Sequence, residues 1–215
     1  MKVELVIFDM DGLMFDTEKV AKRAWKEAGD KFQYKFEGEI FDRFLGRNIV
    51  AVRNEIIETY GEECPVDEII KEVKYLENKI VDDDGLVVKE GLYDLLEHLK
   101  GINVKLAVAT SSKRERATKL LTLAKIENEF DYIICGDEVT KSKPDPEIFL
   151  KVAEKLNCKP ENCIVMEDSR QGIQAAKSAG MNPIMVPDLL DADEETAARL
   201  YKKIKHLGEA IEIIR

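Results

Sequence analysis

The chain has 215 residues, of which 45% are apolar and 35% are charged, and its formal net charge is −10 at pH 7. This length and composition are typical of a globular protein with a sizeable core, built as one domain or as a core with a smaller inserted domain. The acidic balance argues against nucleic-acid binding, because no basic face is available to neutralise phosphates. A small phosphorylated substrate is compatible with it, since a bound cation and a few local basic residues can set the field of a site.

The sequence predicts neither a secretory signal nor a membrane partner. The first apolar run, Val3 to Phe8, is interrupted by Glu4 and ends in acids. No stretch approaches the roughly 20 apolar residues of a membrane span. The spacing of the cysteines does not suit a metal site, so we predict reduced thiols and a cytoplasmic protein. These cysteines are Cys64, Cys135, Cys158 and Cys163. A monomer is the default expectation, since no sequence feature bears on the oligomeric state.

Short apolar segments alternate with amphipathic ones along most of the chain, which is typical of a parallel α/β sheet. The expected strands are Val3–Phe8, Val104–Ala109, Tyr132–Cys135, Cys163–Met166 and Pro183–Val186. The expected helices between them are Glu90–Lys100, Lys113–Leu123, Pro146–Leu156 and Arg170–Ala179. We predict a Rossmann-like, doubly wound parallel sheet.

One stretch, from about Thr17 to Asp82, shows helical periodicity alone. It carries three apolar stripes, which begin at Val20, Ile49 and Ile69. We predict an all-helical cap domain at residues 16–84, inserted into an α/β core formed by residues 1–15 and 85–215. Residues 82–85 (Asp-Asp-Asp-Gly) are expected to form a flexible return linker, with a solvated charge run at the three aspartates as the alternative.

The most informative feature is a pair of aspartates, Asp9 and Asp11, directly after the first apolar run. Two carboxylates at the tip of a buried strand are costly unless a cation or a reaction uses them. One carboxylate can attack a phosphorus atom, while the other exchanges a proton with the leaving or attacking oxygen. Gly12 then allows a tight turn and leaves room for a ligand. Alone this motif is moderately specific, because acidic strand ends also bind metals in unrelated folds.

Two later segments also place phosphate-binding groups after a strand. Thr110, Ser111 and Ser112 open a predicted helix, where a hydroxyl and free N–H groups bind phosphate oxygens; the alternative is a simple helix N-cap. Lys143 precedes Pro144, which disfavours helix there and predicts a loop. Such a lysine can bring a fixed positive charge to a phosphoryl group, and the alternative is an exposed loop lysine.

The fourth strand runs into Glu167 and Asp168, whose carboxylates suit Mg²⁺, a hard cation that prefers oxygen ligands. In doubly wound sheets the ligand crevice lies at the carboxyl ends of the strands. The polar residues that follow the strands are therefore expected to converge. They are Asp9, Asp11, Thr110, Lys143 and Asp168.

With these motifs the chain resembles the haloacid dehalogenase superfamily, in the subgroup that includes β-phosphoglucomutase and small sugar-phosphate phosphatases. The resemblance spans nearly the whole chain, and four motifs occur in order. They are Phe8–Gly12 with Phe15–Glu18, Ala109–Ser112, Lys143–Pro146 with Phe149, and Glu167–Ser169 with Gly172.

The resemblance implies a role for each matched position. Asp9 would be the nucleophile that forms an aspartyl-phosphate, and Asp11 would be the general acid and then the general base. Thr110, the backbone N–H of Ser111, and Lys143 would stabilise the transferring phosphoryl group. This agrees with the physics of phosphoryl transfer, which depends mostly on positioning and charge neutralisation.

The resemblance also implies Mg²⁺ as the cofactor. Its ligands would be Asp9, the backbone carbonyl of Asp11, and Asp168, with Glu167 binding directly or through water. The inserted helical segment would be a mobile cap that closes over the site and shapes specificity.

Within the subgroup, the choice lies between a phosphatase and a mutase. A mutase has a cap histidine and a cap arginine at positions that here align near Ala21 and Ile49. The only histidines are His98 and His206, both predicted outside the cap. Arg47 is the candidate cap contact for substrate, with a solvated arginine as the alternative.

We therefore predict a Mg-dependent phosphatase that hydrolyses a sugar or polyol phosphate through an aspartyl-phosphate. The alternative is a β-phosphoglucomutase-type mutase. A phospho-receiver domain or a non-catalytic phosphate-binding protein is the alternative from another class. A receiver has its acids on different strands and about half this length, and a silent binding protein would be expected to lack a motif residue.

Overall fold

A computed structural model describes residues 2–215 and divides the chain into two compact units. The core unit is formed by Met1–Phe15 and Val88–Arg215, and the helical unit by Asp16–Val87. The chain therefore leaves the core soon after the predicted nucleophile strand and returns before the helix that precedes the second strand.

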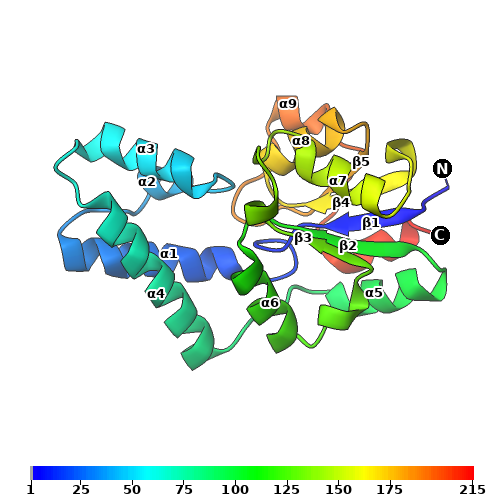
Figure 1. Cartoon of the computed structure of the whole chain (residues 1–215), viewed down its shortest axis with the longest axis horizontal. Helices are drawn as coiled ribbons and strands as arrows, with labels where there is room; N and C mark the ends of the chain where they lie inside the picture. The colour runs from blue at the N-terminus through cyan, green and yellow to red at the C-terminus, as the bar shows by residue number, and fades with distance from the viewer. Residues whose placement is uncertain (1) are drawn as a thin grey trace. The chain divides into compact units, whose positions relative to one another are not determined.

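The core unit contains a parallel sheet of six strands in the order β3-β2-β1-β4-β5-β6 (Figure 1). The strands are β1 (Leu5–Phe8), β2 (Lys105–Ala109), β3 (Tyr132–Ile134), β4 (Cys163–Glu167), β5 (Asn182–Met185) and β6 (Lys202–Lys203). This strand order is that of a doubly wound Rossmann-like sheet, so the predicted fold class is confirmed. Strand β6 was not predicted, because two exposed lysines carry no apolar pattern.

Helices cover both faces of this sheet, with α7 and α8 on one face and α5 on the other (Figure 1). The helices of the core unit are α5 (Leu92–Gly101), α6 (Arg114–Leu123), α7 (Glu147–Lys155), α8 (Arg170–Ser178) and α9 (Glu194–Ala197). Short 3₁₀ turns lie at η1 (Glu127–Glu129), η2 (Gly136–Glu138), η3 (Pro160–Asn162) and η4 (Leu207–Glu212). Every residue of β1 is buried, because the strand is central and covered on both sides.

The register brings the carboxyl ends of three strands to one level. Phe8, the last residue of β1, pairs with Val108 of β2 and Met166 of β4. The Asp9 N–H donates to the Met166 carbonyl at 3.0 Å, so the pairing continues one residue past β1. The strand order reverses between β1 and β4, which is where doubly wound sheets bind ligands.

The helical unit contains α1 (Thr17–Phe32), α2 (Glu39–Asp42), α3 (Ile49–Tyr60) and α4 (Val66–Asp84). The three predicted apolar stripes lie on α1, α3 and α4 and form a core of their own, except for Ile49, which is exposed. Trp25 sits in this core with its ring 4.8 Å from that of Phe44 and 5.2 Å from that of Phe36. This unit therefore has an independent aromatic centre.

The prediction of a flexible return linker at residues 82–85 is wrong. Residues 82–84 form the last turn of α4, which ends at Gly85 with a φ of 86°. The Lys79 ammonium pairs with Asp83 one helical turn on, at 2.8 Å, and such pairs favour continuation of a helix. The three aspartates are exposed, as the alternative of a solvated charge run requires.

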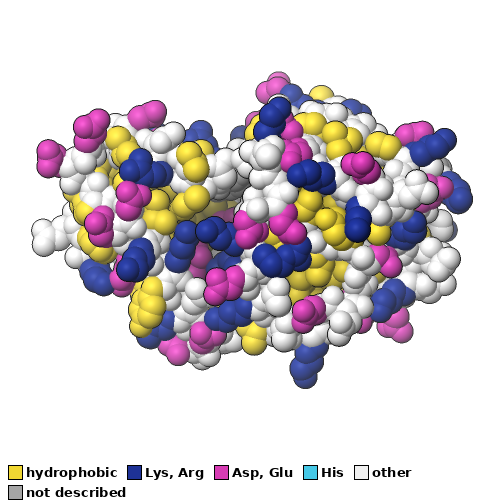
Figure 2. Space-filling model, in the orientation of Figure 1, with side chains coloured by type: hydrophobic (Ala, Val, Ile, Leu, Met, Phe, Trp, Pro, Cys, Tyr) yellow, Lys and Arg dark blue, Asp and Glu magenta, His cyan; other side chains and the backbone are white. Residues whose placement is uncertain are grey.

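Among residues 2–215, no helix is long and apolar enough to cross a membrane. Figure 2 shows Lys and Arg interspersed with Asp and Glu over the visible face, without a large area of one sign. All four cysteines are free.

Candidate active site

One buried ammonium joins the ends of three strands. Lys143 Nζ donates to Asp9 Oδ1 at 2.6 Å, to Glu167 Oε1 at 2.7 Å and to the Ala109 carbonyl at 3.0 Å. The Lys143 side chain is 5% exposed, so the alternative of an exposed loop lysine is wrong. The predicted meeting of residues from β1, β4 and the loop before α7 is thus seen directly.

The loop that carries Lys143 is braced by Glu147, the first residue of α7. The Glu147 carboxylate accepts from the Thr140 N–H at 3.0 Å, the Thr140 hydroxyl at 2.7 Å and the Lys141 N–H at 2.8 Å. The Lys151 ammonium and these hydrogen bonds lower the pKa of Glu147 to about 2. The loop is therefore held to its own helix by an ionised carboxylate.

Burial and charge act in opposite directions at this cluster. Burial raises the pKa of Asp9 to about 7; the Lys143 ammonium opposes this rise, and the Glu167 carboxylate adds to it. Burial disfavours the charged form of Lys143, but attraction to Asp9 and Glu167 outweighs it and raises the pKa of Lys143. The Lys143 ammonium also lies 5.0 Å from the centre of the Phe149 ring. The site is therefore short of positive charge even with its lysine ionised.

Three carboxylates at this edge have the arrangement of a metal site. Ligand oxygens of Asp9, Glu167 and Asp168 all lie within 4.8 Å of one another. Together with Lys143 they carry a formal charge of −2 when ionised, which a divalent cation would neutralise. A set of carboxylate oxygens suits a hard cation such as Mg²⁺, so the residues present fit the predicted cofactor.

Glu167 is fully buried and both of its oxygens are engaged. Lys143 donates to Oε1, while the Ser169 N–H and hydroxyl donate to Oε2 at 3.0 and 2.8 Å. The Ser169 hydroxyl in turn accepts from the Gly172 N–H at 3.1 Å and caps α8. Since each carboxylate oxygen has a second lone pair, Glu167 can bind a metal and still hold Lys143.

Gly172 makes room for the Glu167 carboxylate. A Cβ added at Gly172 would lie 1.8 Å from Glu167 Oε1 and 1.9 Å from Cδ. We expect Gly172→Ala to lower the free energy of unfolding by about 1–3 kcal/mol, because the overpacked carboxylate must move away from Lys143. Chemical denaturation measures this. Gly101→Ala is the matched control, because nothing lies within 4 Å of its added Cβ, and it should not destabilise. Equal effects of the two variants would contradict the assignment.

Thr110 and Ser111 follow β2 in a tight turn. Thr110 is buried, and its hydroxyl accepts from the Ser112 N–H at 3.0 Å. Helix α6 begins only at Arg114 with Lys113 as its N-cap, so the predicted helix start at Thr110, Ser111 and Ser112 is wrong, and so is the alternative of a simple N-cap there. Ser111 is exposed, and its carbonyl packs so closely on Gly136 that a Cβ there would lie 2.2 Å from it. The turn therefore has a fixed backbone at the carboxyl end of the sheet.

Asp11 is held by the same segment that carries this turn. The Ser112 hydroxyl donates to Asp11 Oδ2 at 2.7 Å, and Arg116 Nη2 donates to Oδ1 at 3.2 Å. Arg116 was not among the predicted site residues. No pattern in the sequence distinguished it from the other charged residues near the start of α6, because Ser112 lies before the helix and shares no helical face with Arg116.

Arg47, the predicted substrate contact, belongs to the helical unit. Its guanidinium pairs with Glu55 at 2.9 Å, and Arg43 pairs with the same carboxylate at 3.1 Å. The Arg47 side chain is 41% exposed, so a role in binding stays a prediction. Both histidines lie in the core unit, where His98 Nε2 is 2.7 Å from the Ile214 carbonyl.

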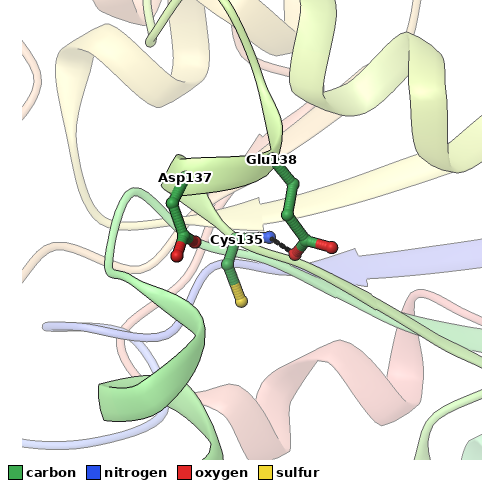
Figure 3. Close-up of side chains that lie close together, drawn as sticks. All are labelled: Cys135, Asp137 and Glu138. Atoms are coloured by element: carbon green, nitrogen blue, oxygen red, sulfur yellow. Dashed lines mark hydrogen bonds between the residues drawn. The ribbon is translucent and has the colours of Figure 1, made fainter.

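A second cluster of possible metal ligands lies after β3 and consists of Cys135, Asp137 and Glu138 (Figure 3). The Cys135 N–H donates to the Glu138 carboxylate at 2.8 Å. The Arg114 guanidinium pairs with Glu138, and the backbone N–H of Arg114 donates to the Asp137 carboxylate at 3.1 Å. Burial raises the pKa of the Cys135 thiol to about 12. With a protonated thiol and acids already bound to Arg114, this cluster braces the start of α6 and does not suit a metal.

Comparison with known proteins shows the family. The model of the haloacid dehalogenase-like hydrolase family matches residues 6–186. A phosphorylated carbohydrates phosphatase from Thermotoga maritima is 36% identical over 185 residues, which cover 85% of this chain and 84% of that protein. The β-phosphoglucomutase of Bacillus subtilis is 32% identical over 188 residues, 83% of this chain and 81% of that one. The solved structure of a β-phosphoglucomutase from Clostridium difficile, 26% identical, matches with a TM-score of 0.80 over 96% of this chain and 92% of that chain. The chain belongs to the haloacid dehalogenase-like hydrolase family, and the predicted resemblance is confirmed.

Proposed function

We propose that this protein is a Mg²⁺-dependent phosphatase that hydrolyses a small sugar or polyol phosphate through an aspartyl-phosphate on Asp9. The observation that carries the proposal is the buried cluster in which Lys143 bridges Asp9 and Glu167 at the switch point of the sheet. A strand-end carboxylate next to a fixed ammonium provides both a nucleophile and a charge for the phosphate it attacks.

In the first step an Asp9 oxygen attacks the phosphorus atom and the ester P–O bond breaks. The electron pair of that bond goes to the leaving alkoxide, which takes a proton from Asp11. Lys143, the Thr110 hydroxyl and the Ser111 N–H neutralise the phosphoryl oxygens as charge moves onto them. A Mg²⁺ ion bound by Asp9, Asp168, Glu167 and the Asp11 carbonyl would supply further positive charge to this site.

In the second step water attacks the phosphorus atom of the aspartyl-phosphate. Asp11, now ionised, takes a proton from that water as the P–O bond to Asp9 breaks. The products are inorganic phosphate and a free Asp9 carboxylate. The same residue thus gives a proton in one half of the reaction and recovers it in the other.

The names of the relatives support the substrate class, since one acts on phosphorylated carbohydrates and another on a phosphosugar. The helical unit, which we take to be the cap, contains no histidine, because His98 and His206 both lie in the core unit. This favours hydrolysis over the mutase reaction. Arg47 is the proposed cap contact for substrate. The cytoplasmic location and the monomeric state of the protein stay predictions.

The experiment is a panel of sugar, polyol and nucleoside phosphates, with release of inorganic phosphate as the readout. We expect release from sugar or polyol phosphates with Mg²⁺, and a loss of at least about 100-fold with excess EDTA that added Mg²⁺ reverses. The wild type should also gain thermal stability with Mg²⁺ alone, because a ligand that binds only the native state stabilises it.

Release that is unaffected by EDTA would contradict the metal assignment. Isomerisation of β-glucose 1-phosphate without phosphate release would favour the mutase. Silence on every substrate, together with no Mg²⁺ effect on stability, would overturn the proposed function.

A further inference from the structure

The direction of the Asp11 carboxylate is set by two side chains from one short segment. Ser112, just before α6, donates to one carboxylate oxygen, and Arg116, in the first turn of α6, donates to the other. Both donors lie on a segment about 100 residues beyond Asp11, as the separations of 101 and 105 residues show. Two donors on opposite oxygens fix the plane of the carboxyl group, which one donor leaves free to rotate, and the second lone pair of an oxygen stays available for the proton that Asp11 delivers.

The backbone around Asp11 is fixed independently of these side chains. The Gly12 N–H donates to the Phe15 carbonyl at 3.0 Å, and the Met14 N–H donates to the Met10 carbonyl at 3.0 Å. Phe15 and Asp11 also form an isolated bridge. The side-chain torsions of Asp11 are therefore the freedom that Ser112 and Arg116 remove.

The burial of the pair makes this restraint effective. The Arg116 side chain is 22% exposed and that of Asp11 is 26% exposed. An ion pair in open solvent does little to orient its two side chains, because water competes for both partners and both side chains are flexible. At this depth the competition is weaker, and the planar guanidinium offers donors in a rigid geometry.

We propose that Arg116 is a positioning residue that, together with Ser112, aims the Asp11 carboxyl group at the leaving-group oxygen. The inference rests on the proposed function and adds to it a residue that does not contact the reacting atoms. Without Arg116 the carboxyl group rotates about the remaining Ser112 hydrogen bond. Proton delivery then becomes slower, while the attack by Asp9 is unchanged.

The test compares two esters of similar size whose leaving groups differ. The p-nitrophenolate ion leaves readily without a proton, whereas phenolate leaves poorly and depends on the general acid. General acid catalysis contributes about 10²–10⁴-fold, so a misdirected acid should cost about tenfold on phenyl phosphate. We expect Arg116→Met to lower kcat/KM for phenyl phosphate about tenfold more than for p-nitrophenyl phosphate.

Three further variants keep the inference testable. Arg199→Met is the matched control, because Arg199 pairs with Glu195 at 2.5 Å and is 27% exposed; it should leave the ratio of the two kcat/KM values unchanged. Arg116→Lys should bring the ratio of the two kcat/KM values part of the way back from that of Arg116→Met to that of the wild type. Ser112→Ala removes the other donor and should shift the ratio in the same direction, which covers the case that Arg116→Met does not fold.

An equal loss on both esters in Arg116→Met and Ser112→Ala would overturn the inference while the wild-type activity upholds the proposed function. No change in either variant would also overturn it. A wild type that hydrolyses neither ester nor any substrate of the panel would overturn the proposed function and the inference together.

Discussion

Asp9→Asn is expected to reduce phosphate release by about 10⁴-fold or more, the loss seen when a nucleophile is removed. The amide has no anionic oxygen to attack phosphorus, but it has the same size and can still accept from Lys143. Burial already disfavours the charged form of Asp9 and raises its pKa, so loss of this charge should not destabilise the fold. Initial rates of phosphate release and a thermal melt measure the two effects separately.

The matched control for this variant is Asp94→Asn, the same change at an exposed position on α5. It should keep wild-type activity. If Asp9→Asn kept more than about a hundredth of the wild-type rate of phosphate release, the assignment of a covalent intermediate to Asp9 would be wrong. Direct attack by water on the substrate would then be favoured. If its melting temperature fell steeply, Asp9 would be a structural anion that Lys143 requires.

Lys143→Met is expected to cost about 3–5 kcal/mol of stability, because it leaves two buried carboxylates together without a counterion. Asp9 and Glu167 are 11% and 0% exposed at their side chains, so water cannot replace the lost ammonium. Activity should fall by about 10²–10³-fold, the usual loss when one group that stabilises transition-state charge is removed. Urea denaturation and initial rates measure these effects.

Added Mg²⁺ should restore part of the stability of Lys143→Met, since it would neutralise the same carboxylates. Lys141→Met is the matched control, because Lys141 lies in the same loop, is 71% exposed and pairs with Asp145 only at 3.5 Å. It should change stability by less than about 1 kcal/mol. A Lys143→Met protein as stable and as active as the wild type would refute the bridging role of Lys143.

Much of the core could be predicted from the sequence because its signals are local. The apolar run before Asp9 and the similar runs before Thr110 and Asp168 each mark a buried strand and the point where it ends. In a parallel sheet those ends must meet at one edge, so the candidate residues could be placed together without knowing any side-chain position. The three stripes that became α1, α3 and α4 were predicted for the same reason, since a period near 3.6 residues identifies a helical face.

The errors occurred where local signals are weak or ambiguous. Residues 82–84 look like a linker by composition, but pairing of Lys79 with Asp83 and of Arg23 with Asp84 keeps them helical. Strand β6 is two exposed lysines that pair with β5 only because the chain returns there. Neither feature has an apolar period that could be recognised in the sequence.

The contacts that define the chemistry were decided by tertiary structure. Lys143 and Asp9 are 134 residues apart, and nothing near Lys143 distinguishes a buried ammonium from a solvated one. Arg116 meets Asp11 only because the fold brings together two segments that are 105 residues apart, and Glu167 fits only because Gly172 has no side chain. The sequence by itself therefore determined which residue types stand at the strand ends. The tertiary structure decided which of these residues form ion pairs with one another. The burial of a side chain and its distance from a partner are set only when distant segments pack together.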